Sequence, residues 1–296
     1  MKLSRQQKAY LYAAITVLLW STVASAFKLS LRHMDPMQLL LWADIASIVC
    51  LGVILSVSGK LRLLLSYSKK ELAAAAGLGI LNPFLYYIIL FSAYDLLPAQ
   101  VAQPLNYTWA ITLALLSVPL LRHKIGIRDA AAIVISYFGV VLIATHGRLF
   151  SLEFSSTSGV ILALGSTVVW SLYWIFNTRD RHDPVAGLFL NFLFALPFIF
   201  IFCALFSSPW PVSTYGLAGA FYVGVFEMGI AFVLWLKAMK LTESTIKIST
   251  LIFFSPFLSL VFISILVGEA IMISTIIGLV FIIAGNVIQQ TGTNFG

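Results

Sequence analysis

The sequence contains little charge and little cysteine, and both shortages restrict the class of protein. Only 10% of its 296 residues are charged, whereas 60% are hydrophobic. Soluble domains carry about 25% charged residues, so this composition indicates a chain embedded in a lipid bilayer. The two cysteines, Cys50 and Cys203, lie far apart inside apolar runs, which argues against a disulfide framework and against a metal site. We predict no metal ligands and no cofactor.

The positive charge of the chain is not concentrated in one place. Its net charge is +7, but the 18 Lys and Arg residues occur in small groups between apolar runs and form no continuous basic stripe. Such a distribution is typical of membrane orientation signals and not of a polyanion-binding surface. We therefore expect a lipid bilayer as the surroundings and no nucleic-acid partner.

Apolar runs bounded by charge, Gly and Pro predict ten transmembrane helices, since a bilayer core about 30 Å thick needs roughly 20 apolar residues per span. The predicted spans are residues 9–29, 36–57, 72–94, 98–120, 128–146, 157–177, 184–206, 213–237, 243–266 and 270–289. A membrane β-barrel would instead show segments of about ten residues that alternate in polarity. The predicted fold class is an all-α polytopic membrane protein.

The charges between the spans predict the orientation. If the N-terminus is cytoplasmic, only Lys28, Arg32 and Arg148 of the 18 positive residues fall on the opposite side. Positive residues in short loops stay cytoplasmic, so we expect both termini inside, which an even number of spans requires. The basic start and the triplet Ala24-Ser25-Ala26 also imitate a cleavable signal peptide, but its removal would leave an odd number of spans.

The sequence contains an internal repeat. Asp35-Pro36 is echoed by Asp183-Pro184, and three longer matches keep a similar offset. These pair LLWST (Leu18–Thr22) with VVWSL (Val168–Leu172), Gly79 and Asn82 with Gly224 and Glu227, and Leu105–Leu116 with Leu251–Phe262. Each half would hold five spans, so the second copy enters the membrane inverted. We predict two inverted five-helix repeats, residues 1–148 and 149–296, with a binding site between them.

The repeated features also carry a family resemblance. They are Trp20 and Trp170, the two Asp-Pro pairs and the stretch FFSPFLSLVFISILVGEAI, which contains Glu269. With them the chain resembles EamA-type members of the drug/metabolite transporter superfamily. Through NYTW (106–109) and GIAFVLW (229–235) it is most similar to the aromatic amino-acid exporter branch. The resemblance implies a secondary transporter of the cytoplasmic (inner) membrane that exports amino acids or other small metabolites.

Two acids fall in the middle of predicted spans, Asp44 in the second and Glu227 in the eighth. A charge at that depth costs about 2.5–3.5 kcal/mol on insertion scales, so a proton or a cationic substrate group must offset it. Both acids are therefore candidates for substrate binding and for proton coupling. The repeat pairs Glu227 with Asn82 and brings Asp44 within one residue of pairing with Asn191, so we expect all four to face one cavity. The alternative is that they are neutral and hydrogen-bond between helices.

Aromatic and polar residues recur at helical spacing on several spans, as a pocket for a small amphipathic solute requires. The predicted substrate-binding residues are Trp20, Asp44, Asn82, Tyr86, Gln103, Tyr107, Trp170, Tyr173, Asn191, Glu227 and Trp235. Pro83, Pro104 and Pro256 interrupt predicted spans and are candidate hinges, since proline frees a backbone carbonyl and kinks a helix.

These patterns predict an alternating-access carrier and not an enzyme. The sequence contains no G-x-S-x-G, Walker A or H-E-x-x-H motif, and we assign no catalytic residue. We predict a secondary transporter, an exporter of small metabolites that include apolar or aromatic amino acids, with protons as a possible coupling ion. A passive channel is the main alternative. An intramembrane enzyme would have to use Asp44 and Glu227 as its acid pair.

Overall fold

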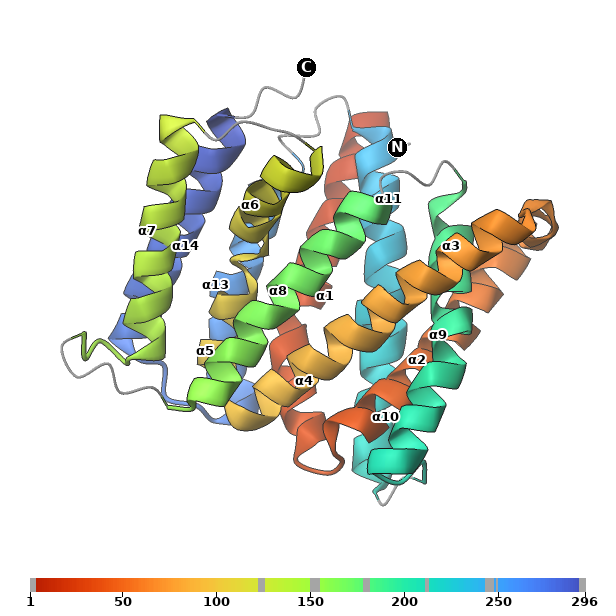
Figure 1. Ribbon diagram of the computed structural model, residues 1–296, viewed down its shortest axis with the longest axis horizontal. Helices are drawn as coiled ribbons and strands as arrows, with labels where there is room; N and C mark the ends of the chain where they lie inside the picture. The colour runs from red at the N-terminus through yellow and green to blue at the C-terminus, as the bar shows by residue number, and fades with distance from the viewer. Residues whose placement is uncertain are drawn as a thin grey trace.

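The computed structural model of the protein describes residues 4–121, 126–149, 155–177, 182–210, 213–242, 248 and 250–292. Within these ranges all regular secondary structure is helical and no strand occurs, so the helical class is confirmed (Figure 1). Among the described residues, seven helices are long and apolar enough to cross a membrane, and Leu251–Val267 and Ile273–Gln289 are shorter apolar helices.

The helices lie where the apolar runs predict them. The first half of the chain holds α1 (Arg5–Leu31), α2 (Pro36–Val57), η1 (Leu61–Ser66), α3 (Lys69–Gly79), η2 (Ile80–Leu85), α4 (Tyr86–Leu96), α5 (Ala99–Asn106), α6 (Trp109–Leu121) and α7 (Ile127–Ala144). The second half holds α8 (Thr157–Asn177), α9 (Pro184–Phe206), α10 (Thr214–Tyr222), η3 (Val223–Ala231), α11 (Phe232–Leu241), η4 (Thr250–Phe254), α13 (Ser255–Phe262), η5 (Ile263–Val267) and α14 (Ile273–Gly292). Residues 243–247 and 249, at the predicted start of the ninth span, lie outside the described residues.

The two Asp-Pro pairs begin helices in the same way. The Asp35 carboxylate accepts hydrogen bonds from the backbone N–H groups of the second and third residues of α2, and Asp183 does the same for α9. In both helices proline occupies the first position, where its missing N–H costs nothing and its fixed φ favours helix. Equivalent residues of the two halves therefore perform the same local task.

Several helices are interrupted near their middles. Asn82, directly before Pro83, has φ −144° and ψ 117° and kinks the π-helical segment η2, because proline disfavours the helical conformation of the preceding residue. Pro104 lies inside α5, and the chain leaves the helix three residues later, at Tyr107. Pro256 lies in the first turn of α13, where it is compatible with helix, so it marks a helix start and not a kink.

Glycines allow helices from the two halves of the chain to approach closely. A methyl group at Gly79 would collide with the backbone carbonyl of Asn191, and one at Gly224 would collide with that of Ala43. The largest contact of this kind joins α7 and α14. Gly139 lies against Gly278, while Gly285 lies against Ala132 and Ser136. Small residues at such points let helix backbones pack without intervening side chains.

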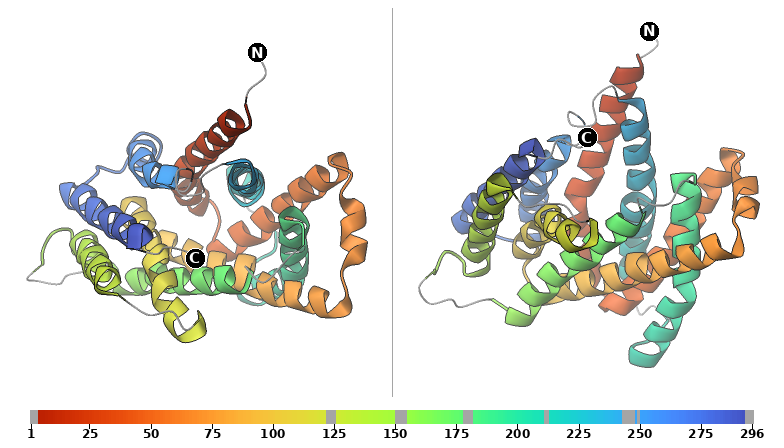
Figure 2. Two further views of the ribbon diagram at one scale, coloured as in Figure 1. Left: turned by 90° about the horizontal axis from the view of Figure 1, so that it is seen from above. Right: turned by 45° about the horizontal axis from the view of Figure 1, so that its top comes forward.

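The helices form one bundle in which elements distant in sequence are neighbours. The pair α7 and α14 forms one side of the molecule, and α2, α3 and α9 lie on the other (Figures 1 and 2). Between them α1 packs on α11 and α13, and α4 packs on α8. The start of α1 and the end of α14 lie at the same end of the molecule, the top of Figure 1.

Candidate functional site

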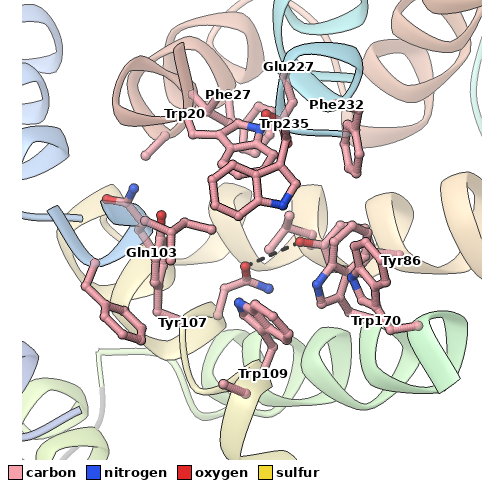
Figure 3. Close-up of a pocket in the computed structure, with 18 of the residues that line it drawn as sticks. Trp20, Phe27, Tyr86, Gln103, Tyr107, Trp109, Trp170, Glu227, Phe232 and Trp235 are labelled. Carbon is pink, nitrogen blue, oxygen red and sulfur yellow. Dashed lines mark hydrogen bonds between the residues drawn. The ribbon is translucent and has the colours of Figure 1, made fainter. Parts of the chain in front are cut away.

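A cavity of about 170 Å³ lies in the centre of the bundle (Figure 3). Its wall is drawn from both halves of the chain, and most of the residues that form it are aromatic or apolar. They are Trp20, Val23, Ala24, Phe27, Tyr86, Leu90, Tyr94, Gln103, Asn106, Tyr107, Trp109, Ala110, Trp170, Trp174, Glu227, Phe232, Trp235, Ile252, Phe253 and Asn286. An apolar cavity of about 150 Å³ admits benzene, so this volume suits a solute with a single ring.

Most of the predicted binding residues meet at this cavity. Those that line it are Trp20, Tyr86, Gln103, Tyr107, Trp170, Glu227 and Trp235. They come from six helical elements, α1, α4, α5, α8, η3 and α11, together with the turn that follows α5. Helix faces that mix aromatic rings with hydrogen-bonding groups in the sequence therefore meet at one cavity in the fold.

Glu227 is the acid that belongs to the cavity. It lies in the π-helical segment η3, and its Oε1 atom accepts a hydrogen bond of 3.2 Å from the Tyr87 hydroxyl. Trp20 lies beside it (Figure 3). Its other oxygen, Oε2, is buried and has no hydrogen-bond partner among the described residues. Segments of π-helix occur frequently at functional sites, and this one presents a half-satisfied carboxylate to a ring-lined space.

One wall of the cavity is held by a chain of hydrogen bonds. The Tyr86 hydroxyl donates to Oδ1 of Asn106 at 3.3 Å, and Nδ2 of Asn106 donates to the Ser166 hydroxyl at 3.0 Å. The Tyr86 ring is stacked on Trp170, with a centroid distance of 4.5 Å and an interplanar angle of 29°. These contacts fix the positions of Tyr86 and Trp170, so this wall is preorganised.

The facing wall is built from rings of α1 and α11. The centroid of Trp20 lies 5.5 Å from that of Trp235 and 5.9 Å from that of Phe232. Phe232 also contacts Trp170 edge-to-face, at 6.0 Å, and so closes the ring of aromatic side chains. Aromatic faces are electron-rich and can attract a cation as well as an apolar body.

The break between α5 and α6 exposes backbone at the cavity. α5 ends at Asn106 and α6 begins at Trp109. The carbonyl oxygen of Tyr107 accepts a hydrogen bond of 3.2 Å from Nδ2 of Asn286 on α14. A broken helix is tolerated at membrane depth where protein or a cavity surrounds the freed backbone groups, and both conditions hold at Tyr107.

Four predicted site residues lie elsewhere. Asp44, Asn82, Tyr173 and Asn191 are buried in the helix packing and are not among the residues that line this cavity. The Asn191 amide is satisfied when its Nδ2 donates to the carbonyl oxygens of Gly187 and Ala75, both at 3.1 Å, and in this orientation its oxygen faces the Tyr173 hydroxyl. Of the two acids and two amides expected to share one cavity, only Glu227 lines this one.

The structure adds lining residues that sequence reasoning did not assign. Trp109 and Asn106 belong to the NYTW stretch, which carries only the family resemblance, and Asn286 is an amide inside the last apolar helix, one turn before Gln289. An intramembrane amide is costly without a partner, so this signal for Asn286 was available. Trp174 and Phe232 carried no distinguishing signal, because a ring at helical spacing faces lipid as often as it faces a cavity.

Beyond the cavity, at the end of the molecule where α1 ends, polar contacts join the two halves of the chain. The Glu269 carboxylate accepts hydrogen bonds from the backbone N–H groups of Ala99 at 2.7 Å and Gln100 at 3.1 Å, the first residues of α5. Arg32 donates to the carbonyl of Val267 at 2.7 Å. A carboxylate at a helix N-terminus is favourable through both hydrogen bonds and the helix dipole, so these contacts close this end firmly.

Outside the spans, an ion pair also joins the halves. Nζ of Lys60 lies 2.5 Å from Oδ2 of Asp183, the residue that caps α9. Partial burial by itself would raise the pKa of Asp183. The hydrogen bond from Lys60 and those from the α9 backbone outweigh burial and hold the pKa below its ordinary value. Asp183 is therefore a carboxylate with both its partners in place.

Comparison with known proteins identifies the family. The sequence profile of the EamA-like transporter family matches the chain twice, over residues 7–145 and 157–288. The chain belongs to the EamA-like transporter family. The predicted EamA-type membership is thereby confirmed. The protein is a multi-pass membrane protein with a small-molecule substrate, as in this family of transporters.

Individual relatives agree with this assignment over nearly their whole length. An "Uncharacterized transporter" of Clostridium kluyveri is 26% identical over 96% of this chain and 94% of its own. One from Archaeoglobus fulgidus is 25% identical over 94% of this chain and 96% of its own. A solved crystal structure with 22% identity covers 96% of both chains with a TM-score of 0.66, which shows a shared fold.

Proposed function

We propose that the protein is a ten-helix secondary transporter that exports amino acids with apolar or aromatic side chains, and related small metabolites, by alternating access. The observation that carries the proposal is a central, ring-lined cavity that holds one carboxylate, Glu227. A small amphipathic solute satisfies both parts of such a lining, since its body packs against the rings and its polar group meets the acid.

The proposed architecture is two inverted repeats, residues 1–148 and 149–296. It is supported by the double match of the family profile and by equivalent contacts. Gly79 packs on the backbone of α9, and its counterpart Gly224 packs on that of α2. Between α7 and α14 the equivalence is reciprocal. At an offset of 146, Gly139 corresponds to Gly285 and Ala132 corresponds to Gly278. The contact of Gly139 with Gly278 is therefore equivalent to the contact of Gly285 with Ala132.

The interruptions of the helices follow the same symmetry. The π-helical segments η2 and η3 contain Asn82 and Glu227, which the repeat pairs. The break after α5 at Tyr107 has its counterpart at the junction of η4 and α13. Irregular segments at corresponding positions of two halves are the best pointer to a transporter binding site, and both breaks contribute residues to this cavity.

The orientation we propose has both termini in the cytoplasm and the protein in the cytoplasmic (inner) membrane. It is supported by the uneven distribution of Lys and Arg and by the location of the start of α1 and the end of α14 at one end of the bundle (Figure 1). The contacts of Glu269 and Arg32 then close the outward end. Alternating access would break them as one repeat rocks against the other, with Pro83 and Pro104 as candidate hinges.

The two acids have different roles in this proposal. Glu227 contacts the substrate, whereas Asp44, buried outside the cavity, takes up and releases a coupling proton. Asn82, Tyr173 and Asn191 are buried in the helix packing and do not contact the substrate. A carboxylate buried without a partner is costly unless a proton neutralises it, which supports proton coupling at Asp44.

The test is efflux from proteoliposomes loaded with labelled phenylalanine, tryptophan and leucine. We expect saturable efflux that trans substrate accelerates and that the variant Glu227→Gln loses, while Asp44→Asn loses its response to a pH gradient. Unaltered flux in both variants would remove the acids from the mechanism. Flux that is insensitive to trans substrate would favour a passive channel over a carrier.

A further inference from the structure

The cavity contains buried acceptors that lack a partner. Among the residues that line it, the buried side-chain oxygens Oε2 of Glu227, Oε1 of Gln103 and Oδ1 of Asn286 have no hydrogen-bond partner in the described structure. Nε1 of Trp174 is a buried nitrogen in the same state. Buried polar groups are normally satisfied, so the three oxygens favour a ligand that donates hydrogen bonds.

Hydrogen bonding fixes the orientation of the Asn286 amide. Asn286 is 1% exposed, and its Nδ2 atom donates to the carbonyl oxygen of Tyr107. Rotating the amide would set two oxygens against each other, so Nδ2 must point at Tyr107. The free atom of Asn286 is therefore an acceptor. Gln103, 4% exposed, offers a second amide oxygen.

The charge of the cavity has one sign. Glu227 is its acid, and no Lys, Arg or His is among the described residues that line it. The nearby cation Lys28 donates to the carbonyl oxygens of Tyr94 at 2.7 Å and Leu97 at 2.8 Å, and the Arg32 guanidinium donates to that of Val267. Both cations are therefore engaged by backbone carbonyls and do not serve as partners for a substrate carboxylate.

We propose that the cavity recognises a primary ammonium group on a one-ring apolar body, and that a substrate carboxylate is dispensable. The ammonium offers three N–H donors, and its charge is opposite to that of the Glu227 carboxylate in the cavity wall. The surrounding indole rings of Trp20 and Trp235 add cation–π attraction. This inference rests on the proposed function and specifies its substrate class, so that aromatic amines bind at least as tightly as the corresponding amino acids.

The test is a binding titration of the purified full chain in detergent at pH 7. Five of the seven tryptophans, Trp20, Trp109, Trp170, Trp174 and Trp235, line the cavity, so their fluorescence reports occupancy. Four ligands share one phenyl ring and differ in charge. These are phenethylamine, phenylalanine, 3-phenylpropionate and 2-phenylethanol.

We expect phenethylamine to bind at least as tightly as phenylalanine, and both to bind about tenfold or more tighter than the acid and the alcohol, as charge-assisted hydrogen bonds imply. Glu227→Gln should weaken phenethylamine binding about tenfold, whereas Asp95→Asn, which changes an exposed acid away from the cavity, should leave it unaltered. The ligand series uses the parent protein and does not depend on the folding of a variant.

Tighter binding of 3-phenylpropionate than of phenethylamine, equal binding of the amine and the alcohol, or no binding of the amine would each overturn the inference. Efflux of phenylalanine from proteoliposomes is measured in parallel. Continued efflux without amine binding would refute the ammonium preference and leave the proposed transport intact. Amine binding without efflux of any amino acid would instead refute the proposed function.

Discussion

Asp44 and Glu227 are both acids inside apolar helices, yet their surroundings differ in every respect that matters for binding. Glu227 lines a cavity and accepts a hydrogen bond from Tyr87. Asp44 is 0% exposed, and neither of its oxygens has a hydrogen-bond partner within the described chain. The position of an acid within a span therefore does not reveal whether a substrate can reach it.

The largest expected effect separates the two acids directly. Glu227→Gln should reduce amine binding about tenfold or more, because it removes the negative charge that offsets the ligand. Asp44→Asn should leave the binding curve within about twofold, because Asp44 does not line the cavity. Fluorescence titration of both variants measures this, and a tenfold loss in Asp44→Asn would contradict the separation.

The glycines at two close helix contacts give the next largest effect. Gly224→Ala and Gly79→Ala should each destabilise the protein by about 1–3 kcal/mol, because the new methyl group would meet backbone that cannot move aside. Thermal unfolding in detergent measures the loss. Gly77→Ala and Gly165→Ala are matched controls, since nothing lies within 4 Å of the added methyl group at either position.

A smaller effect concerns the partner that only Glu227 possesses. Tyr87→Phe removes the hydroxyl that donates to Oε1 and should cost about 1 kcal/mol of stability. It should also alter the dependence of amine binding on pH, because the carboxylate loses a stabilising donor. The same titration repeated between pH 6 and pH 9 checks this. An unchanged pH profile would show that Tyr87 does not act on the acid.

The smallest expected effect concerns Asp183, a carboxylate that, unlike Asp44, has its hydrogen-bond partners present. Lys60→Met should destabilise the protein by at most about 1 kcal/mol, because the pair is partly exposed. The pKa of Asp183 is lowered in the folded state, so its contribution is present above the unfolded pKa near 4 and is lost as pH falls through the folded value. The difference in melting temperature between parent and variant should be constant from pH 5 to 8 and shrink below about pH 4.

The sequence predicted the helical segments well because each property involved is local. Runs of apolar residues, and aspartate before proline, determine where a helix lies and begins, whatever surrounds it. The cavity is not local. Tyr86, Gln103 and Trp170 were predicted from mixed stripes, but the same stripes contain Asn82 and Tyr173, which do not line the cavity. Which side of a span faces the cavity depends on packing partners far away in sequence.

The lining residues that the sequence did not predict also depend on contacts with distant parts of the chain. Asn286 gains its role from the Tyr107 carbonyl, 179 residues earlier in the chain, and no periodicity within the last span indicates that contact. The break at Tyr107 was expected at Pro104, three residues earlier, because proline is the visible signal and the released backbone is not. The repeat compensates in part, since it pairs Asn82 with Glu227 and so marks both interrupted segments.

The glycine contacts between α7 and α14 determine how that pair can move. Glycine lets the backbones of the two helices touch at two levels. Gly139 contacts Gly278, and Gly285 contacts Ala132. Sliding by one turn would replace these glycine contacts with side-chain contacts, which favours the present register. In the proposed transport cycle we therefore expect α7 and α14 to move together and the bundle to open among the helices that carry the cavity tryptophans.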